Sequence, residues 1–183
     1  MDKKKALDAI AFEIENCSVC KEEKSGKAVV GEGNPDAQVV FIGEAPGKTE
    51  AVTGRPFVGR SGKLLRSLIR DIGLKEEEVY ITSPVKYLPD RGTPTSAHIN
   101  HGRIHLEKQL AVINPQIIVL LGSVATQGVL QEKFPVMQKH GTTVQKNGKT
   151  FFLTIHPAAA VRFAKFRPVI KGDFEKLQQS LLV

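Results

Sequence analysis

Short apolar runs alternate with longer amphipathic segments along this chain. Four runs have the length and the β-branched content of buried strands: residues 38–42, 79–82, 117–121 and 151–155. Apolar residues recur at helical spacing in four other segments: residues 3–15, 59–72, 96–112 and 172–182. Strands that alternate with helices predict a parallel sheet with right-handed crossovers. We therefore expect an α/β fold, a three-layer α/β/α sandwich around a central four-stranded parallel sheet.

Turn-forming residues stand where these elements end. Gly73 follows the helical segment 59–72 and suits its end, because glycine readily adopts the left-handed conformation. Gly122 follows the third strand and begins another helix. Asn147 and Gly148 predict a tight hairpin whose second arm becomes the fourth strand.

The length and charge of the chain narrow the possible classes of protein. Its 183 residues suffice for one domain with a hydrophobic core, so we expect a single domain over residues 1–183. Lys and Arg number 26 against 19 Asp and Glu, and the net charge of +7 favours polyanionic partners. The charged start lacks the apolar core of a signal peptide, and no apolar run approaches about 18 residues. These features predict a soluble cytoplasmic protein without a membrane partner.

Two turns carry the residues best suited to chemistry. The turn Gly43-Glu44-Ala45-Pro46-Gly47 follows the first strand, and His156-Pro157 follows the fourth. Loops at the carboxyl ends of parallel strands surround one crevice in open α/β sheets. The sequence therefore predicts that Glu44 and His156 face each other across a single cleft. Simpler interpretations are a capping role for His156, a helix N-terminal charge for Glu44 and an anion-binding turn at 43–47.

Two cysteines, Cys17 and Cys20, directly follow the first helical segment. They have the spacing Cys-x-x-Cys, and the chain contains no others. In a cytosolic protein such a pair is more often a metal or redox element than a structural disulfide.

Seven short motifs, taken in order, resemble one known family. They are Cys17-x-x-Cys20, Val30-Gly31-Glu32-Gly33-Asn34-Pro35, Gly43-Glu44-Ala45-Pro46-Gly47, Gly54-Arg55-Pro56-Phe57-Val58-Gly59, Val79-Tyr80-Ile81-Thr82, Asn114-Pro115 and His156-Pro157. Each motif is weak by itself, but together they span about 140 residues in register. On these motifs the chain is similar to the family-four, iron–sulfur type members of the uracil-DNA glycosylase superfamily.

The resemblance implies a monofunctional DNA glycosylase, which flips uracil or a related deaminated base out of DNA and hydrolyses the N-glycosidic bond. Such a reaction needs a hydrogen-bond donor at the base oxygen and a carboxylate near the sugar or the water. By resemblance, His156 contacts uracil O2, while Glu44 and Glu50 are the candidate carboxylates. The chemistry needs no cofactor. We expect a monomer that acts on single- or double-stranded DNA containing uracil, near the nucleoid of a bacterial or archaeal cell.

The resemblance also assigns residues to the base and to the DNA. Phe57 would stack on a flipped base, although a lone Phe more often packs in a core. The other base-binding candidates are Gly43, Ala45, Pro46, Gly47 and Ser83. The DNA-contact candidates are Arg55, Lys86, Arg162 and Lys165, and a solvated surface is the simpler interpretation of the last two. The run 158–162, where the resembling enzymes insert an apolar wedge, offers only small apolar side chains.

The chain departs from the family in its metal ligands. Family four holds a four-iron, four-sulfur cluster with four cysteines, but Tyr87 and Gly102 stand here at the third and fourth positions. We expect a structural zinc in a Cys₂His₂ site, or a degenerate iron–sulfur site; the simpler interpretation is that the metal is lost and Tyr87 packs in its place. The candidate zinc ligands are Cys17, Cys20, His101 and His105. The two histidines lie one helical turn apart.

A second departure concerns the residue that reads the base. Family four has an asparagine after the strand at 79–82, and this chain has Ser83. A hydroxyl reaches less far than an amide and cannot alone supply the paired contacts that reject cytosine. We expect relaxed specificity toward deaminated bases, or a slower uracil enzyme.

Two other functions stay open on the sequence. A lesion-binding module of the same fold could keep its DNA surface and lack turnover, given Ser83 and the incomplete cysteine set. A nucleotide- or phosphoester-binding enzyme could use the turn at 43–47, although the chain lacks a complete Gly-x-x-x-x-Gly-Lys-Ser/Thr phosphate loop.

Overall fold

A sheet of six strands forms the centre of the computed structural model, which describes residues 2–132 and 134–181. In spatial order the strands are β2 (Glu32–Gly33), β4 (Tyr80–Thr82), β3 (Val39–Ile42), β6 (Ile117–Leu121), β8 (Lys149–Thr154) and β7 (Thr142–Lys146). The four inner strands run parallel, and β2 and β7 pair antiparallel with their neighbours. The predicted four-stranded parallel sheet is therefore present, with one antiparallel strand added on each side.

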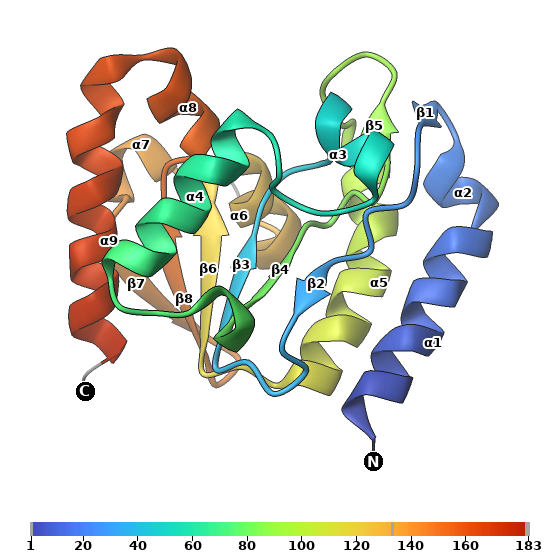
Figure 1. The fold of residues 1–183 in the computed structure, drawn as a ribbon, viewed down its shortest axis with the longest axis horizontal. Coiled ribbons are helices and arrows are strands. Elements are labelled where there is room, and N and C mark those ends of the chain that lie inside the picture. Colours follow the sequence, from blue (N-terminus) through green and yellow to red (C-terminus); the bar gives the residue numbers. More distant parts are fainter. Residues whose placement is uncertain (1, 133, 182–183) are drawn as a thin grey trace.

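Helices cover both faces of this sheet (Figure 1). The first face packs against α1 (Lys3–Asn16), α5 (Ser96–Ile113) and α6 (Gly122–Leu130), and the second against α4 (Arg60–Asp71) and α9 (Arg167–Leu181). In β3, Val40 and Ile42 face the first set of helices, whereas Val39 and Phe41 face the second. Both faces are buried, so the inner strands have continuous apolar sequences. The three-layer α/β/α architecture is confirmed.

The remaining elements are short. They are α2 (Ser18–Lys21), β1 (Lys24–Ser25), α3 (Lys48–Thr53), η1 (Glu76–Glu78), β5 (Leu88–Pro89), α7 (Val136–Lys139), α8 (Pro157–Arg162) and η2 (Ala164–Phe166). Strands β1 and β5 form a separate two-stranded antiparallel sheet. Neither strand is predicted from the sequence, because a two-residue strand has no periodicity.

Most predicted boundaries agree with the structure within two residues, and one does not. The last helix begins at Arg167 rather than near residue 172. Pro168 occupies its first turn, where proline is tolerated because the first N–H groups have no partner within the helix. The predicted end at Leu182 lies outside the described residues. In the hairpin, Asn147 and Gly148 both have positive φ, 52° and 72°, as a type I′ turn requires.

Loops that follow the parallel strands gather at the carboxyl edge of the sheet. Gly43 follows β3, Ser83 follows β4, Gly122 follows β6, and Ile155-His156 follow β8. This edge lies at the top of Figure 1, next to α3 and α8. Among the described helices, none is both long enough and apolar enough to cross a bilayer.

Gly62 lets α4 pack directly on the loop that precedes it. An added Cβ at Gly62 would lie 2.0 Å from the carbonyl carbon of Phe57. A glycine-to-alanine change inside a helix usually stabilises by about 1 kcal/mol. Here the clash should make the same change destabilising. Gly62→Ala should therefore lower the free energy of unfolding measured by urea titration.

Gly172→Ala is the matched control for this prediction. Gly172 lies in α9, and nothing lies within 4 Å of an added Cβ there. This substitution should leave stability unchanged or raise it. If both variants were equally stabilised, the close contact between α4 and Phe57 would not exist.

Candidate active site

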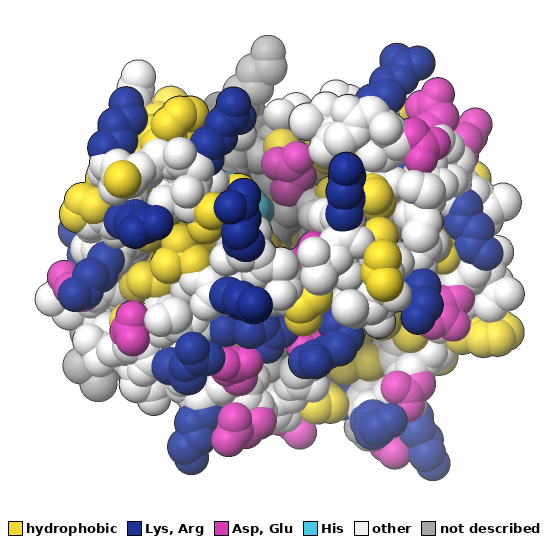
Figure 2. Space-filling view, turned by 45° about the horizontal axis from the view of Figure 1, so that its top comes forward, with side chains coloured by type: hydrophobic (Ala, Val, Ile, Leu, Met, Phe, Trp, Pro, Cys, Tyr) yellow, Lys and Arg dark blue, Asp and Glu magenta, His cyan; other side chains and the backbone are white. Residues whose placement is uncertain are grey.

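A cavity of about 410 Å³, which we call the cleft, opens at the carboxyl edge of the sheet. The predicted residues that line it are Glu44, Ala45, Pro46, Gly47, Glu50, Phe57, Ser83 and His156. Figure 2 shows a hollow on this side of the molecule with a histidine side chain inside it and Lys or Arg side chains around it. Segments more than 100 residues apart in the sequence thus meet at one place, and Glu44 and His156 share a single cleft.

His156 stands immediately before α8 and presents its ring to the cleft. Its Nδ1 accepts a hydrogen bond of 3.1 Å from the N–H of Ala158, so the proton of the neutral ring lies on Nε2. Burial lowers the pKa of His156 to about 4, because desolvation disfavours the charged ring. Gly122 makes room for it, since an added Cβ there would lie 2.9 Å from His156 Cβ. His156 therefore caps α8 and also offers a neutral N–H donor.

Glu44 occupies the turn after β3. The N–H of Gly43 donates to the carbonyl of Thr82 at 2.9 Å, which joins this turn to the end of β4. Burial raises the pKa of the Glu44 carboxyl above its ordinary value. The cleft thus combines a desolvated carboxyl group with a neutral imidazole, a pairing suited to acid–base or electrostatic chemistry.

Phe57 lies directly over Gly43 in the cleft. Its ring is 5.9 Å from the His156 ring, with an interplanar angle of 30°. An added Cβ at Gly43 would lie 2.5 Å from Phe57 Cζ, so only glycine leaves the ring this position. Phe57 has φ of 51°, a left-handed conformation that is strained for a bulky residue. The surrounding structure must therefore hold this residue in place.

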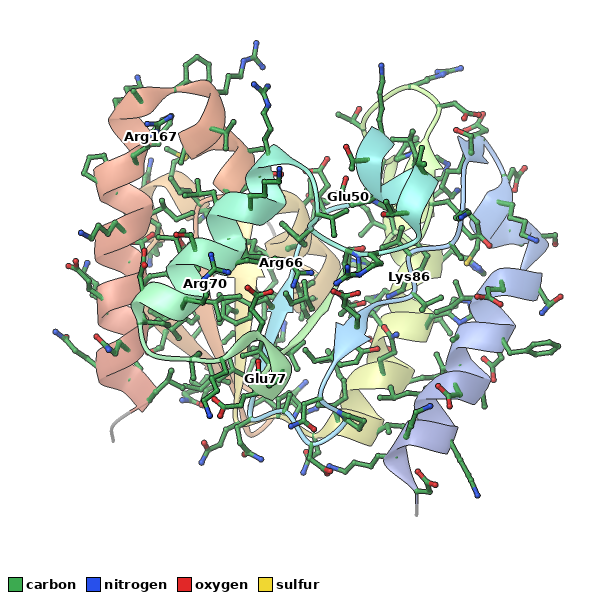
Figure 3. All side chains as sticks on the ribbon, in the orientation of Figure 1. Glu50, Arg66, Arg70, Glu77, Lys86 and Arg167 are labelled. Carbon is green, nitrogen blue, oxygen red and sulfur yellow. The ribbon has the colours of Figure 1, made fainter. Side chains whose placement is uncertain are left out.

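Glu50 and Arg66 hold the Phe57 loop from two sides. Glu50, on α3, accepts hydrogen bonds at Oε1 from the N–H groups of Val58 at 2.8 Å and Gly59 at 2.7 Å. Arg66, on α4, donates from Nε to the carbonyl of Phe57 at 2.9 Å. Figure 3 shows both side chains on the two helices that flank this loop. One carboxylate oxygen of Glu50, a candidate catalytic residue, is thus already hydrogen-bonded to the backbone.

Ser83 lines the cleft, but its hydroxyl is already engaged. Its Oγ donates to the carbonyl of Val85 at 2.8 Å, and the residue is buried. The hydroxyl proton is therefore used within the protein, and only the oxygen lone pairs remain for a bound molecule. Ser83 offers an acceptor to the cleft and no side-chain donor.

Lys86 is not on the DNA-accessible surface, contrary to the prediction from the sequence. It is 1% exposed, and its Nζ donates to Thr82 Oγ1 at 2.7 Å and to Gln109 Oε1 at 2.8 Å. Burial lowers the pKa of Lys86 to about 7. Figure 3 shows it in the interior, on the side of the molecule where α5 lies. An ammonium group enclosed in this way is out of reach of a phosphate.

The other three DNA-contact candidates are exposed. Arg55 forms two hydrogen bonds of 2.9 Å with Glu32 and lies away from the cleft lining. The Arg162 guanidinium lies 5.3 Å from the ring centroid of Phe163, and the Lys165 ammonium lies 5.2 Å from that of Phe166. Arg162 is the last residue of α8, and Lys165 lies just after it in η2.

The four predicted metal ligands meet in space. One ligand atom from each of Cys17, Cys20, His101 and His105 lies within 4.8 Å of the others. Cys17 Sγ is 3.1 Å from His101 Nε2. The His105 side chain is 9% exposed, and its Nδ1 has no hydrogen-bond partner among the described residues. The two thiols and two imidazole rings therefore form a group that could bind a metal ion.

A four-cysteine cluster does not fit this chain. Tyr87, at the third ligand position, is buried and its hydroxyl donates to the carbonyl of Ile14 at 3.4 Å. An added Cβ at Gly102, the fourth position, would lie 2.0 Å from the carbonyl oxygen of Pro84. Any cysteine at position 102 would therefore require the backbone to move. The group that remains is Cys₂His₂.

Several residues that line the cleft are not predicted from the sequence. Lys48, Pro56 and Ser61 line it from α3, the Phe57 loop and the first turn of α4. Leu88 and Gly92 line it from the segment around β5. The glycines at 47, 54, 59 and 62 were the available signal for the first set. No sequence signal marks the second set, which belongs to the segment around the two-residue strand β5.

Comparison with known proteins places these features in a family. The model of the uracil DNA glycosylase superfamily matches residues 30–178. The chain is 39% identical to a type-4 uracil-DNA glycosylase of Saccharolobus solfataricus, over 96% of this chain and 86% of the relative. It is 36% identical to the type-4 enzyme of Archaeoglobus fulgidus, over 94% and 92%, and 35% identical to that of Thermotoga maritima, over 93% and 92%.

Proposed function

Because this chain belongs to the uracil DNA glycosylase superfamily, we propose that it excises uracil from DNA by hydrolysis of the N-glycosidic bond, which begins base excision repair. The observation that carries the proposal is the shared cleft, in which Glu44, Phe57, Ser83 and His156 converge. A cleft of about 410 Å³ is of a size suited to a small ligand such as a nucleobase.

The base would be bound between an aromatic face and polar edges. Phe57, held over Gly43, supplies a face on which a flipped base can stack. Ser83 can accept from uracil N3–H, because its own proton is donated to Val85. Ser83 leaves uracil O4 without a side-chain donor, and this supports weak discrimination at that edge.

His156 would stabilise the departing base. As the glycosidic bond breaks, negative charge accumulates on the uracil oxygens. Neutral His156 donates from Nε2 toward O2, and its lowered pKa keeps the ring uncharged near neutral pH. A donor that is fixed before the reaction requires no reorganisation when the charge develops.

Glu44 would act on the sugar side. A carboxylate there can orient the attacking water and stabilise an oxocarbenium-like sugar. Burial raises the pKa of Glu44. On acidification its carboxylate should therefore take up a proton, and excision should slow, at a higher pH than it would with an ordinary glutamate. Glu50 would act as a positioning residue, since its Oε1 is engaged by Val58 and Gly59.

The partner is DNA, which agrees with the net charge of +7. We propose that a monomer acts on uracil in single- or double-stranded DNA, in the cytoplasm of a bacterial or archaeal cell. We also propose a single domain over residues 1–183.

The Cys/His group would hold one zinc ion away from the reaction. Two thiolates and two imidazoles are a common ligand set for structural zinc. Cys17 is the N-cap of α2 and Cys20 lies within α2, whereas His101 and His105 lie on α5. A metal bound by all four would join α1 and α2 to α5, and its contribution would be to stability.

Activity is tested with oligonucleotides that contain one uracil. We expect strand breaks after alkali treatment, and we expect His156→Ala to reduce the single-turnover rate by about 10²–10³-fold, the usual cost of one lost oxyanion donor. Glu44→Gln should also slow excision. Lys5→Ala, an exposed lysine at the start of α1, should leave the rate unchanged. Intact strands with retained binding would instead identify a lesion-binding module.

Base selection is tested at Ser83. On a panel with uracil, hypoxanthine and xanthine, the wild type should act on more than one base or excise uracil slowly. Ser83→Asn adds an amide donor and should raise the preference for uracil, by about tenfold for one added hydrogen bond of 1.4 kcal/mol. Ser83→Ala, which adds no donor, should not. Fast, uracil-only excision by the wild type would contradict this assignment.

Metal content is tested on the purified protein. We expect one zinc per chain by elemental analysis, and loss of that zinc in Cys20→Ser and His105→Ala. His98→Gln is the control, because His98 faces Glu23 at 3.5 Å and lies outside the group of four. Cobalt substitution should give the visible bands of a thiolate-bound tetrahedral ion. Iron with acid-labile sulfide, or protein without stoichiometric metal, would overturn the zinc assignment.

A further inference from the structure

Lys86 is a buried charged residue that has no role in the proposed mechanism. It is 1% exposed and lies in the interior on the side of α5 (Figure 3). Among the residues that the structure describes, no carboxylate forms an ion pair with it. An ammonium group buried without a carboxylate lowers stability, because its lost hydration is only partly replaced. The place of Lys86 in the fold therefore needs an explanation other than stability.

Three acceptors surround the three N–H bonds of the Lys86 ammonium group. Its Nζ donates to Thr82 Oγ1 at 2.7 Å and to Gln109 Oε1 at 2.8 Å. The Val30 carbonyl accepts from the same nitrogen at 3.4 Å and from Gln109 Nε2 at 2.6 Å. The Lys86 side chain thus joins the end of β4, the helix α5 and the segment before β2 at one point.

The backbone of Lys86 contacts the same segment. The N–H of Val29 donates to the Lys86 carbonyl at 2.8 Å. An added Cβ at Gly31 would lie 2.9 Å from Thr82 Oγ1, so the segment 29–31 packs directly on the end of β4. Lys86 therefore holds this segment with both its side chain and its backbone.

The residues that Lys86 holds are next to residues that line the cleft. Val29 and Ser83 both line it, and each is adjacent in sequence to a hydrogen-bond acceptor of the Lys86 ammonium group. The carbonyl of Thr82 also accepts from the N–H of Gly43 at 2.9 Å, which joins the turn after β3 to the same point. Three parts of the cleft lining are thus fixed relative to one another through Lys86 and Thr82.

We propose that Lys86 is a positioning residue for the flipped base. Lys86 does not line the cleft itself, and it acts by holding Val29 and Ser83 at the separation that the base requires. The proposal rests on the proposed function for the identity of the bound group. A misplacement of about 1 Å can cost about 100-fold in rate. Loss of the Lys86 ammonium group should therefore slow excision more than it weakens DNA binding or stability.

Two variants remove the contact from its two ends. Lys86→Met keeps the length of the side chain and removes the charge, and such replacements in a protein interior are often neutral for stability. Gln109 still has a partner in this variant, because its Nε2 donates to the Val30 carbonyl. Thr82→Val removes the hydroxyl that accepts from Lys86 and keeps the shape of the side chain.

Lys146→Met is the matched control. Lys146 lies on β7, at the edge of the sheet away from β4, and its Nζ donates to the carbonyl of Leu130 at 2.6 Å. The control thus also removes a lysine that holds a backbone carbonyl, but in a part of the sheet that does not line the cleft.

The first measurement is amide hydrogen exchange by NMR, which requires neither DNA nor turnover. Lys86→Met should speed exchange of the Val29 and Gly43 N–H groups by about tenfold, as expected for the loss of one hydrogen bond. Exchange at Val119, in the buried centre of β6, should stay unchanged. A merely structural role would speed exchange at Val119 as well, because the whole domain would open more often.

The second measurement separates the chemical step from binding. Lys86→Met should reduce the single-turnover rate on a uracil oligonucleotide by about tenfold or more. The Kd for an oligonucleotide of normal bases should stay unchanged. Thr82→Val should give the same losses, and the double variant should lose no more than either single variant, since all three lack one and the same contact. Lys146→Met should change none of these values.

Unchanged exchange at Val29 and Gly43 in Lys86→Met would overturn the proposal, and so would an unchanged single-turnover rate. Additive losses in the double variant, or a rate loss no larger than the loss of DNA binding, would also overturn it. If Lys86→Met did not fold, Thr82→Val would decide by the same criteria. A wild type that does not excise uracil would contradict the proposed function alone, and the exchange data would still decide whether Lys86 holds the cleft lining.

Discussion

The buried carboxylate of Glu50 holds the part of the site on which the other residues depend. Together with Arg66 it fixes the backbone on both sides of Phe57, which otherwise would not keep a left-handed conformation. Phe57 in turn covers Gly43 and faces His156. Helices α3 and α4 therefore hold one loop, and this loop places the Phe57 ring against Gly43 and His156.

A second buried network joins the cleft to the Cys/His group. Lys86 donates to Thr82, the last residue of β4, and to Gln109 on α5. Thr82 precedes Ser83 in the cleft, and α5 carries His101 and His105. This polar network thus lies between the two regions, and Tyr87 is buried next to it in the chain.

The sequence predicted the layers, the parallel strands and the meeting of Glu44 with His156, because these follow from periodicity and strand order. Predictions for single side chains depended on tertiary contacts that a sequence does not contain. Lys86 resembles a surface lysine until Gln109 is known to enclose it. Likewise, Ser83 resembles a free hydroxyl until the Val85 carbonyl is placed beside it. The edge strand β2 and the pair β1–β5 are too short to show any pattern.

The chain enters and leaves the fold far from the cleft. Lys3, at the start of α1, contacts the carbonyl of Ile113 just before β6, and Gln178, near the end of α9, contacts that of Ile72 before β4. Both contacts lie at the amino edge of the sheet, opposite to the cleft (Figure 1). A fluorescent tag or a surface tether attached beyond either helix would therefore leave the cleft unobstructed, and immobilised protein should still capture oligonucleotides from solution.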